Sequence, residues 1–117
     1  MNFSTEKTSD ETGKWSVVLV DSELNIVEEV ALYSNHLEIR GLSPNTLDSY
    51  CRDMGVFFSW LNKRNMKFYD VTKRDIISFM GNINNLVGNK KSKSPRTINK
   101  YLSTVSSFYN YYEGIGG

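Results

Sequence analysis

The chain has 117 residues, which is enough for one domain with a hydrophobic core but too few for two. Hydrophobic residues make up 39% of it and aromatic residues 13%, and no apolar run approaches the roughly 18 residues of a membrane span. The single cysteine, Cys51, excludes an internal disulfide and a cysteine-based zinc site. The polar N-terminus lacks the apolar core of a signal peptide, so a cytoplasmic protein is the simplest interpretation.

The net charge of +1 conceals an uneven distribution of charge along the chain. Residues 1–41 hold three basic and eight acidic residues, a net charge of −5. Residues 42–112 hold eleven basic and four acidic residues, a net charge of +7. A basic body behind an acidic leader indicates a nucleic-acid partner. A solvated charged face on an ordinary domain would have the same composition, so charge alone does not decide between the two.

The N-terminal part of the sequence begins with a polar leader. Residues 1–13 are rich in Ser, Thr, Asp, Glu and Lys, a composition that predicts disorder. Residues 15–20, Trp-Ser-Val-Val-Leu-Val, are typical of a short β-strand. Turn residues follow at 21–25, and we expect residues 26–27 to form a brief return strand.

Four helices are expected after this segment. The first runs from about Glu28 to Arg40 and stops at Gly41, a residue type that commonly follows a helix. Ser43 is a good N-cap for the second helix, because its side-chain oxygen can accept a hydrogen bond from a free backbone N–H. Pro44 then occupies the first helical position, where its missing N–H costs nothing.

The third and fourth helices also have clear start signals. Thr72 is the expected N-cap of the third helix, with Asp75 three residues later as a variant of the capping box. Ser94 and Pro95 repeat the Ser-Pro start for the fourth helix, which we expect to end at Gly114.

Apolar residues in the last three helices recur every three or four positions, the spacing of a helix face that packs against a core. In the second helix they are Leu47, Tyr50, Cys51, Met54, Phe57, Phe58 and Leu61; in the third, Ile76, Phe79, Met80, Ile83 and Val87; in the fourth, Ile98, Tyr101, Leu102, Val105, Phe108, Tyr109 and Tyr112. We expect Phe57, Phe79 and Phe108 to be buried in a bundle from about Val27 to Glu113. The predicted fold class is therefore all-α, with a short N-terminal strand or hairpin.

The second and fourth helices resemble each other. Residues 43–47, Ser-Pro-Asn-Thr-Leu, align with residues 94–98, Ser-Pro-Arg-Thr-Ile, at a constant offset of 51 positions. The same offset relates Tyr50 to Tyr101. The pattern indicates either two helices that are used in similar ways or two similar solutions to starting and burying a helix.

Residues that could support catalysis are sparse. The only histidine, His36, has no cysteine or histidine at metal-ligand spacing. The carboxylates show no pairing suited to acid–base chemistry, and no glycine-rich loop follows a strand. Cys51 lies on the apolar stripe and is expected in the core. We therefore expect no enzymatic activity, no cofactor, no metal and no small-molecule ligand.

The residues best suited to binding lie on polar helix faces. The fourth helix has a face without an acidic residue, made of Arg96, Thr97, Asn99, Lys100, Ser103, Thr104, Ser107 and Asn110. The preceding loop adds Lys90, Lys91 and Lys93, and the second helix adds Ser43, Asn45, Thr46, Ser49 and Arg52. Asp48 and Asp53 dilute the face of the second helix.

Side chains of these types can bind nucleic acid. Arginine, lysine and asparagine reach phosphates and base edges, and a helix N-terminus offers free N–H groups to a phosphate. We expect the cations of the fourth helix and its loop to have no opposing acid, which favours DNA. A merely solvated face would carry the same residue types.

Three segments of the chain resemble, in order and at matching spacing, the core-binding domain of tyrosine recombinases, the phage and transposon integrases. The family's first motif is matched by Ser43, Thr46, Tyr50, Asp53, Phe57, Trp60 and Leu61, with Met54 in place of the usual leucine. Residues 71–80 resemble the family's third helix and residues 94–109 its fourth. The resemblance covers residues 15–114.

This resemblance implies a four-helix, SAM-like orthogonal bundle that forms one half of a clamp on double-stranded DNA. The other half would be a C-terminal catalytic domain with Arg, Lys, His-x-x-Arg and Tyr. The implied partners are double-stranded DNA and, for the full-length protein assembled on DNA, other recombinase protomers. Together with the leader predicted from composition at residues 1–13, the resemblance implies a core-binding domain at 14–114 and the start of a linker at 115–117, in a fragment that is itself not catalytic.

The family contacts DNA mainly through its second and fourth helices. Carried over by position, the resemblance implicates Ser43, Asn45, Thr46, Arg52, Arg96, Thr97, Asn99, Lys100 and Ser103. Ser106 stands where the family often has a basic residue, which implies weaker binding by the isolated domain.

Two other classes of protein are also built from short helices. A helical protein-interaction module of the SAM or death-domain type would have the same architecture, and fold alone does not decide function. A helix-turn-helix regulator needs two helices joined by about three or four residues. The long connection between Leu61 and Thr72 argues against that class.

Overall fold

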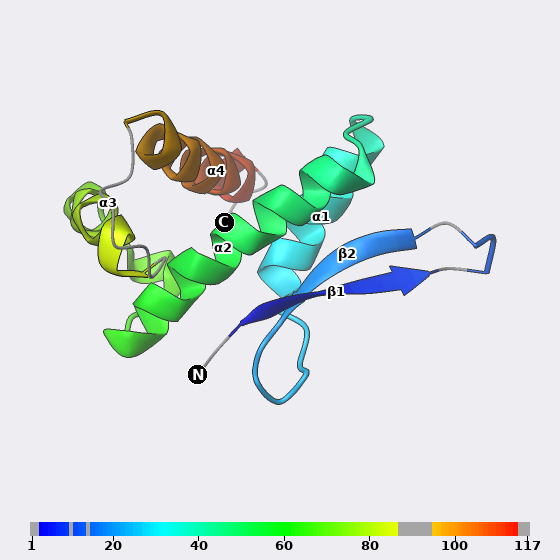
Figure 1. Ribbon diagram of the computed structural model, residues 1–117, viewed down its shortest axis with the longest axis horizontal. Helices are drawn as coiled ribbons and strands as arrows, with labels where there is room; N and C mark the ends of the chain where they lie inside the picture. Colours follow the sequence, from blue (N-terminus) through cyan, green and yellow to red (C-terminus); the bar gives the residue numbers. More distant parts are fainter. Residues whose placement is uncertain (1–2, 10, 14, 87–94, 115–117) are drawn as a thin grey trace.

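The computed structural model describes residues 3–9, 11–13, 15–86 and 95–114. Two strands, β1 (Ser4–Ser9) and β2 (Trp15–Val20), precede α1 (Glu28–Ile39), α2 (Pro44–Lys63), the short 3₁₀ turn η1 (Phe68–Asp70), α3 (Lys73–Leu86) and α4 (Pro95–Gly114). In Figure 1, α2 crosses the centre of the molecule, with the hairpin on one side and α3 and α4 on the other. The helix α2 contacts both strands and every other helix. The predicted SAM-like helical bundle with an N-terminal hairpin is confirmed.

The strand β1 corrects the expectation of a disordered leader. It pairs antiparallel with β2, with Ser4 opposite Val20 and Ser9 opposite Trp15. Composition predicted disorder because β1 has few apolar side chains, but pairing with β2 satisfies its backbone groups while most of its side chains face solvent. The expected return strand is reduced to a single bridge between Val20 and Ile26.

The helix starts follow the predicted capping chemistry where the structure describes them. The backbone N–H of Thr46 donates to Ser43 Oγ at 3.3 Å, with Pro44 at the start of α2. At the start of α3, the N–H of Thr72 donates to Asp75 Oδ2 at 2.8 Å and the N–H of Asp75 donates to Thr72 Oγ1 at 3.3 Å. These two bonds form the capping box. Ser94 lies outside the described residues.

The core lies between α2 and the elements around it. Phe57, Phe79 and Phe108 are fully buried, as predicted, and the Phe57 and Phe79 rings meet edge to face at 5.1 Å. Gly55 lets the hairpin approach α2 closely, because a Cβ at this position would lie 3.1 Å from Leu19 Cδ1. Across the described residues, no helix combines the length and apolar character needed to cross a membrane.

Candidate nucleic-acid interface

The two helices of the predicted DNA face cross at a buried carboxylate. Asp53 of α2 is only 2% exposed. Its Oδ1 accepts a hydrogen bond from Lys100 Nζ at 2.9 Å, and its Oδ2 accepts one from Thr104 Oγ1 at 3.0 Å. Asp53 and Thr104 are 51 positions apart, which is the offset that relates the two similar helices. Equivalent positions of α2 and α4 therefore meet where the helices cross.

A depression of about 230 Å³ opens beside this contact, and we call it the crossing depression. It is lined by Thr46, Ser49, Tyr50, Asp53, Lys100, Ser103 and Thr104. The structure thus brings together five residues of the predicted binding faces, Thr46, Ser49, Lys100, Ser103 and Thr104. Five of the seven lining side chains carry a hydroxyl, so the depression offers mainly neutral hydrogen-bonding groups.

The expectation that Lys100 has no opposing acid is wrong. Asp53, which was expected to dilute the outer face of α2, instead lies inside the bundle and neutralises Lys100. The ammonium of Lys100 also lies 5.3 Å from the centre of the Tyr101 ring. Helical spacing placed Lys100 on a face of one helix but could not show which residue of the neighbouring helix would meet it. The offset of 51 positions was the one signal that linked α2 to α4.

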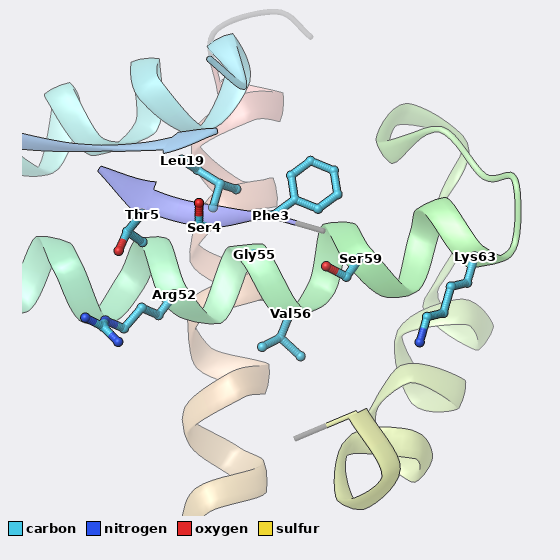
Figure 2. A pocket seen from close by; sticks show the side chains of 9 residues that line it. All are labelled: Phe3, Ser4, Thr5, Leu19, Arg52, Gly55, Val56, Ser59 and Lys63. Atoms are coloured by element: carbon cyan, nitrogen blue, oxygen red, sulfur yellow. The ribbon is translucent and has the colours of Figure 1, made fainter. Parts of the chain in front are cut away.

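Arg52 is likewise paired and lies apart from the crossing depression. Its Nε donates to Asp48 Oδ2 at 2.8 Å, one turn away on the exposed surface of α2. Its side chain lines a second depression of about 440 Å³ between β1 and α2, which we call the hairpin groove. Figure 2 shows the residues of this groove: Phe3, Ser4, Thr5, Leu19, Arg52, Gly55, Val56, Ser59 and Lys63. Arg52 and Lys63 are its charged residues among the described part of the chain, where no carboxylate lines it.

The remaining predicted residues that the structure describes lie near the starts of the two helices. Asn45, Arg96 and Asn99 are exposed, and Thr97 is half-buried. Ser43 is exposed, but its hydroxyl caps α2 and lies 3.0 Å from Thr46 Oγ1. Lys90, Lys91 and Lys93 lie outside the described residues. Two residues that line the crossing depression, Tyr50 and Asp53, were not predicted as binding residues from the sequence.

The other candidate reactive groups belong to the packing of the bundle. Cys51 is buried, and burial raises the pKa of its thiol to about 11. Burial also raises the pKa of Tyr33 to about 12, so both groups keep their protons at neutral pH. The His36 ring packs on the Tyr111 ring, with their centres 4.6 Å apart. Within the described part of the chain, no cluster of three or more His, Cys, Asp or Glu could hold a metal ion.

A comparison with known protein families supports the predicted SAM-like fold. Residues 30–113 match the family described as phage integrase, N-terminal SAM-like domain. The chain therefore belongs to this family, as its three sequence motifs predicted. No solved structure matches the chain.

The curated relatives are recombinases and transposases. Transposase A from transposon Tn554 of Staphylococcus aureus is 26% identical over 107 residues, which cover 85% of this chain and 30% of the transposase. A tyrosine recombinase of Thermosipho africanus is 30% identical over 87 residues, covering 72% of this chain and 29% of that protein. Tyrosine recombinase XerD of Listeria innocua is 35% identical over 74 residues, covering 62% of this chain and 23% of XerD. The chain thus spans less than a third of the length of these relatives.

Proposed function

We propose that this chain is the DNA-binding arm of a tyrosine recombinase, and that it holds double-stranded DNA while a separate catalytic domain cuts and rejoins the strands. The arm itself carries no catalytic role in this proposal. Its partners are duplex DNA and other recombinase protomers assembled on the same DNA. Transposase and recombinase relatives support this function for the parent protein.

The observation that carries the proposal is the convergence of α2 and α4 at the crossing depression. Thr46 and Ser103 face one depression from two different helices, and Arg96 and Asn99 are exposed on the first turns of α4. Short hydroxyl side chains allow close approach to a DNA backbone, and arginine and asparagine can hydrogen-bond to phosphates and base edges. Thr46 lies in the first turn of α2, where N–H groups that the Ser43 cap leaves free would add to the affinity of this surface for phosphate.

The test is an NMR titration of the chain with a short DNA duplex at low salt. We expect amide shifts to concentrate at residues 43–52 and 95–104 and to fade as salt is added, because phosphate contacts release counterions. Binding by the isolated arm should be weak, in the non-specific range of about 10⁻⁴–10⁻⁶ M. Shifts centred on α1, or no shifts at millimolar DNA, would contradict the proposal.

A helical protein-interaction module remains the second candidate, because α1 presents apolar side chains to solvent. Leu32 is 56% exposed and Ile39 is 77% exposed. The two residues are seven positions apart and therefore lie on the same face of α1. Exposed apolar residues that share a face are a feature of protein-binding surfaces. A module of this class would leave the amide spectrum unchanged when DNA is added, so the same titration separates the two candidates.

A further inference from the structure

The ion pair at the helix crossing differs from an ordinary surface pair. The Asp53 side chain is 3% exposed, whereas the Lys100 side chain is 51% exposed. A buried carboxylate is stable only while its charge is compensated and its oxygens accept hydrogen bonds. Both oxygens of Asp53 do so, one from Lys100 and one from Thr104. Withdrawing the ammonium would leave a charge stranded inside the bundle.

Resting on the function proposed above, we propose that Asp53 and Lys100 form a neutral internal latch that positions the two DNA-contacting helices and withholds the charge of Lys100 from DNA. Lys100 is then a positioning residue and not one of the cations that neutralise phosphate. This assignment reverses the role that its place on the polar face of α4 suggests.

Two features of the geometry support the latch. A phosphate that approached the ammonium from the open side would meet the negative charge of Asp53 directly behind it, 2.9 Å from Nζ. Competition for the ammonium therefore favours the carboxylate, which is already desolvated and held by Thr104. Ser49 and Ser103 add hydroxyls to the lining of the crossing depression that can act as neutral donors, whereas the Thr46 hydroxyl already shares a hydrogen bond with Ser43.

The second feature is the place of the latch in the fold. It joins α2 to α4 at equivalent positions of the two helices, 51 residues apart. The pair thus sets the separation of the two helix surfaces that line the crossing depression. A latch with no net charge can do this without adding to non-specific attraction, because that attraction depends on the number of cations that neutralise phosphates.

The experiment compares the salt dependence of duplex binding for four proteins: wild type, Asp53→Asn, Asp53→Asn/Lys100→Gln, and Arg96→Gln. Arg96 is the matched control, because it is an exposed cation one helical turn before Lys100. Fluorescence anisotropy with a short labelled duplex between 50 and 200 mM salt gives each slope of log affinity against log salt. Circular dichroism establishes that each variant is folded.

The latch makes a distinct prediction for each variant. Asp53→Asn frees Lys100 to bind phosphate, so the salt slope of this variant should steepen by about one. Relative to wild type, its gain in DNA affinity should be about threefold to fourfold larger at the low end of this salt range than at the high end. The double variant replaces a neutral pair by another neutral pair, so its slope should equal that of the wild type. Arg96→Gln should reduce the slope by about one.

The opposite pattern would overturn the latch. If Lys100 contacts phosphate in the wild type, the double variant loses about one from its slope and Asp53→Asn leaves the slope unchanged. Wild-type binding without salt dependence would instead refute the proposed function.

A double-mutant cycle on urea stability then tests the pair without DNA. Lys100→Gln should be less stable than Asp53→Asn/Lys100→Gln, and equal stabilities would show that the pair does not hold the helices.

Discussion

The two depressions that flank α2 differ in how their charges are held. In the crossing depression a lysine is neutralised by a buried aspartate, and the other lining residues carry hydroxyls. In the hairpin groove Arg52 and Lys63 face solvent, and the partner of Arg52 lies on the surface of the same helix. Among the residues that the structure describes, the lining of the hairpin groove is therefore more basic than that of the crossing depression. A count of cations along the sequence cannot distinguish these surfaces, whereas the burial of their partners can.

The largest effect should come from the core that holds both depressions in place. Phe57→Ala removes a fully buried ring that contacts Phe79 and Tyr109, so it should lower the free energy of unfolding by about 3–5 kcal/mol. Phe3 is only half-buried and its ring contacts Phe58 at the hairpin side. Urea denaturation should show a clearly smaller loss for Phe3→Ala. Equal losses would mean that the hairpin is as essential to the bundle as its centre.

A smaller loss of stability is expected where the hairpin packs against α2. Gly55→Val would force branched carbons against Leu19 and Phe3, so it should lower stability by about 1–3 kcal/mol. Gly81→Val is the matched control, because a Cβ at that helical position meets nothing within 4 Å. We expect the control to leave the urea midpoint unchanged or to raise it. A loss in the control as large as that at Gly55 would contradict the close approach of hairpin and helix.

The cations near the crossing depression and in the hairpin groove should contribute differently to DNA binding. If DNA lies across the starts of α2 and α4, Arg96→Gln should flatten the salt dependence of binding by about one, whereas Lys63→Gln should change it little. Lys63 is the last residue of α2, far along the helix from Ser43. Anisotropy titrations at several salt concentrations measure both variants. An equal reduction for Lys63→Gln would extend the DNA surface into the hairpin groove.

The smallest effect should come from the cap of α3. The backbone N–H of Thr72 holds the pKa of Asp75 below its usual value of 3.8. A carboxylate whose pKa is lower in the folded state stabilises the fold above its unfolded pKa, and this contribution is lost as the pH falls through the folded pKa. Asp75→Asn should therefore lower the thermal midpoint slightly at neutral pH, and the difference from wild type should shrink below pH 3.8. A difference that persisted in strong acid would assign the effect to packing.

The sequence by itself determined the local features of this protein, because they depend on residues close together in the chain. The caps at Ser43 and Thr72, the apolar stripes and the burial of Phe57 follow from spacing and side-chain chemistry within one helix. The family motifs are made of the same features, which is why they were recognisable without a structure.

Only the tertiary structure decided which residues meet across elements. The pairing of β1 with β2 ordered a stretch whose composition predicted disorder, since the backbone and not the side chains makes the contact. Asp53 was expected on an outer face, yet the crossing of α2 and α4 buries it against Lys100 and Thr104. Helical periodicity specifies the face on which a residue lies, but the charge that compensates a buried side chain comes from a helix almost fifty residues away, and only packing brings the two together.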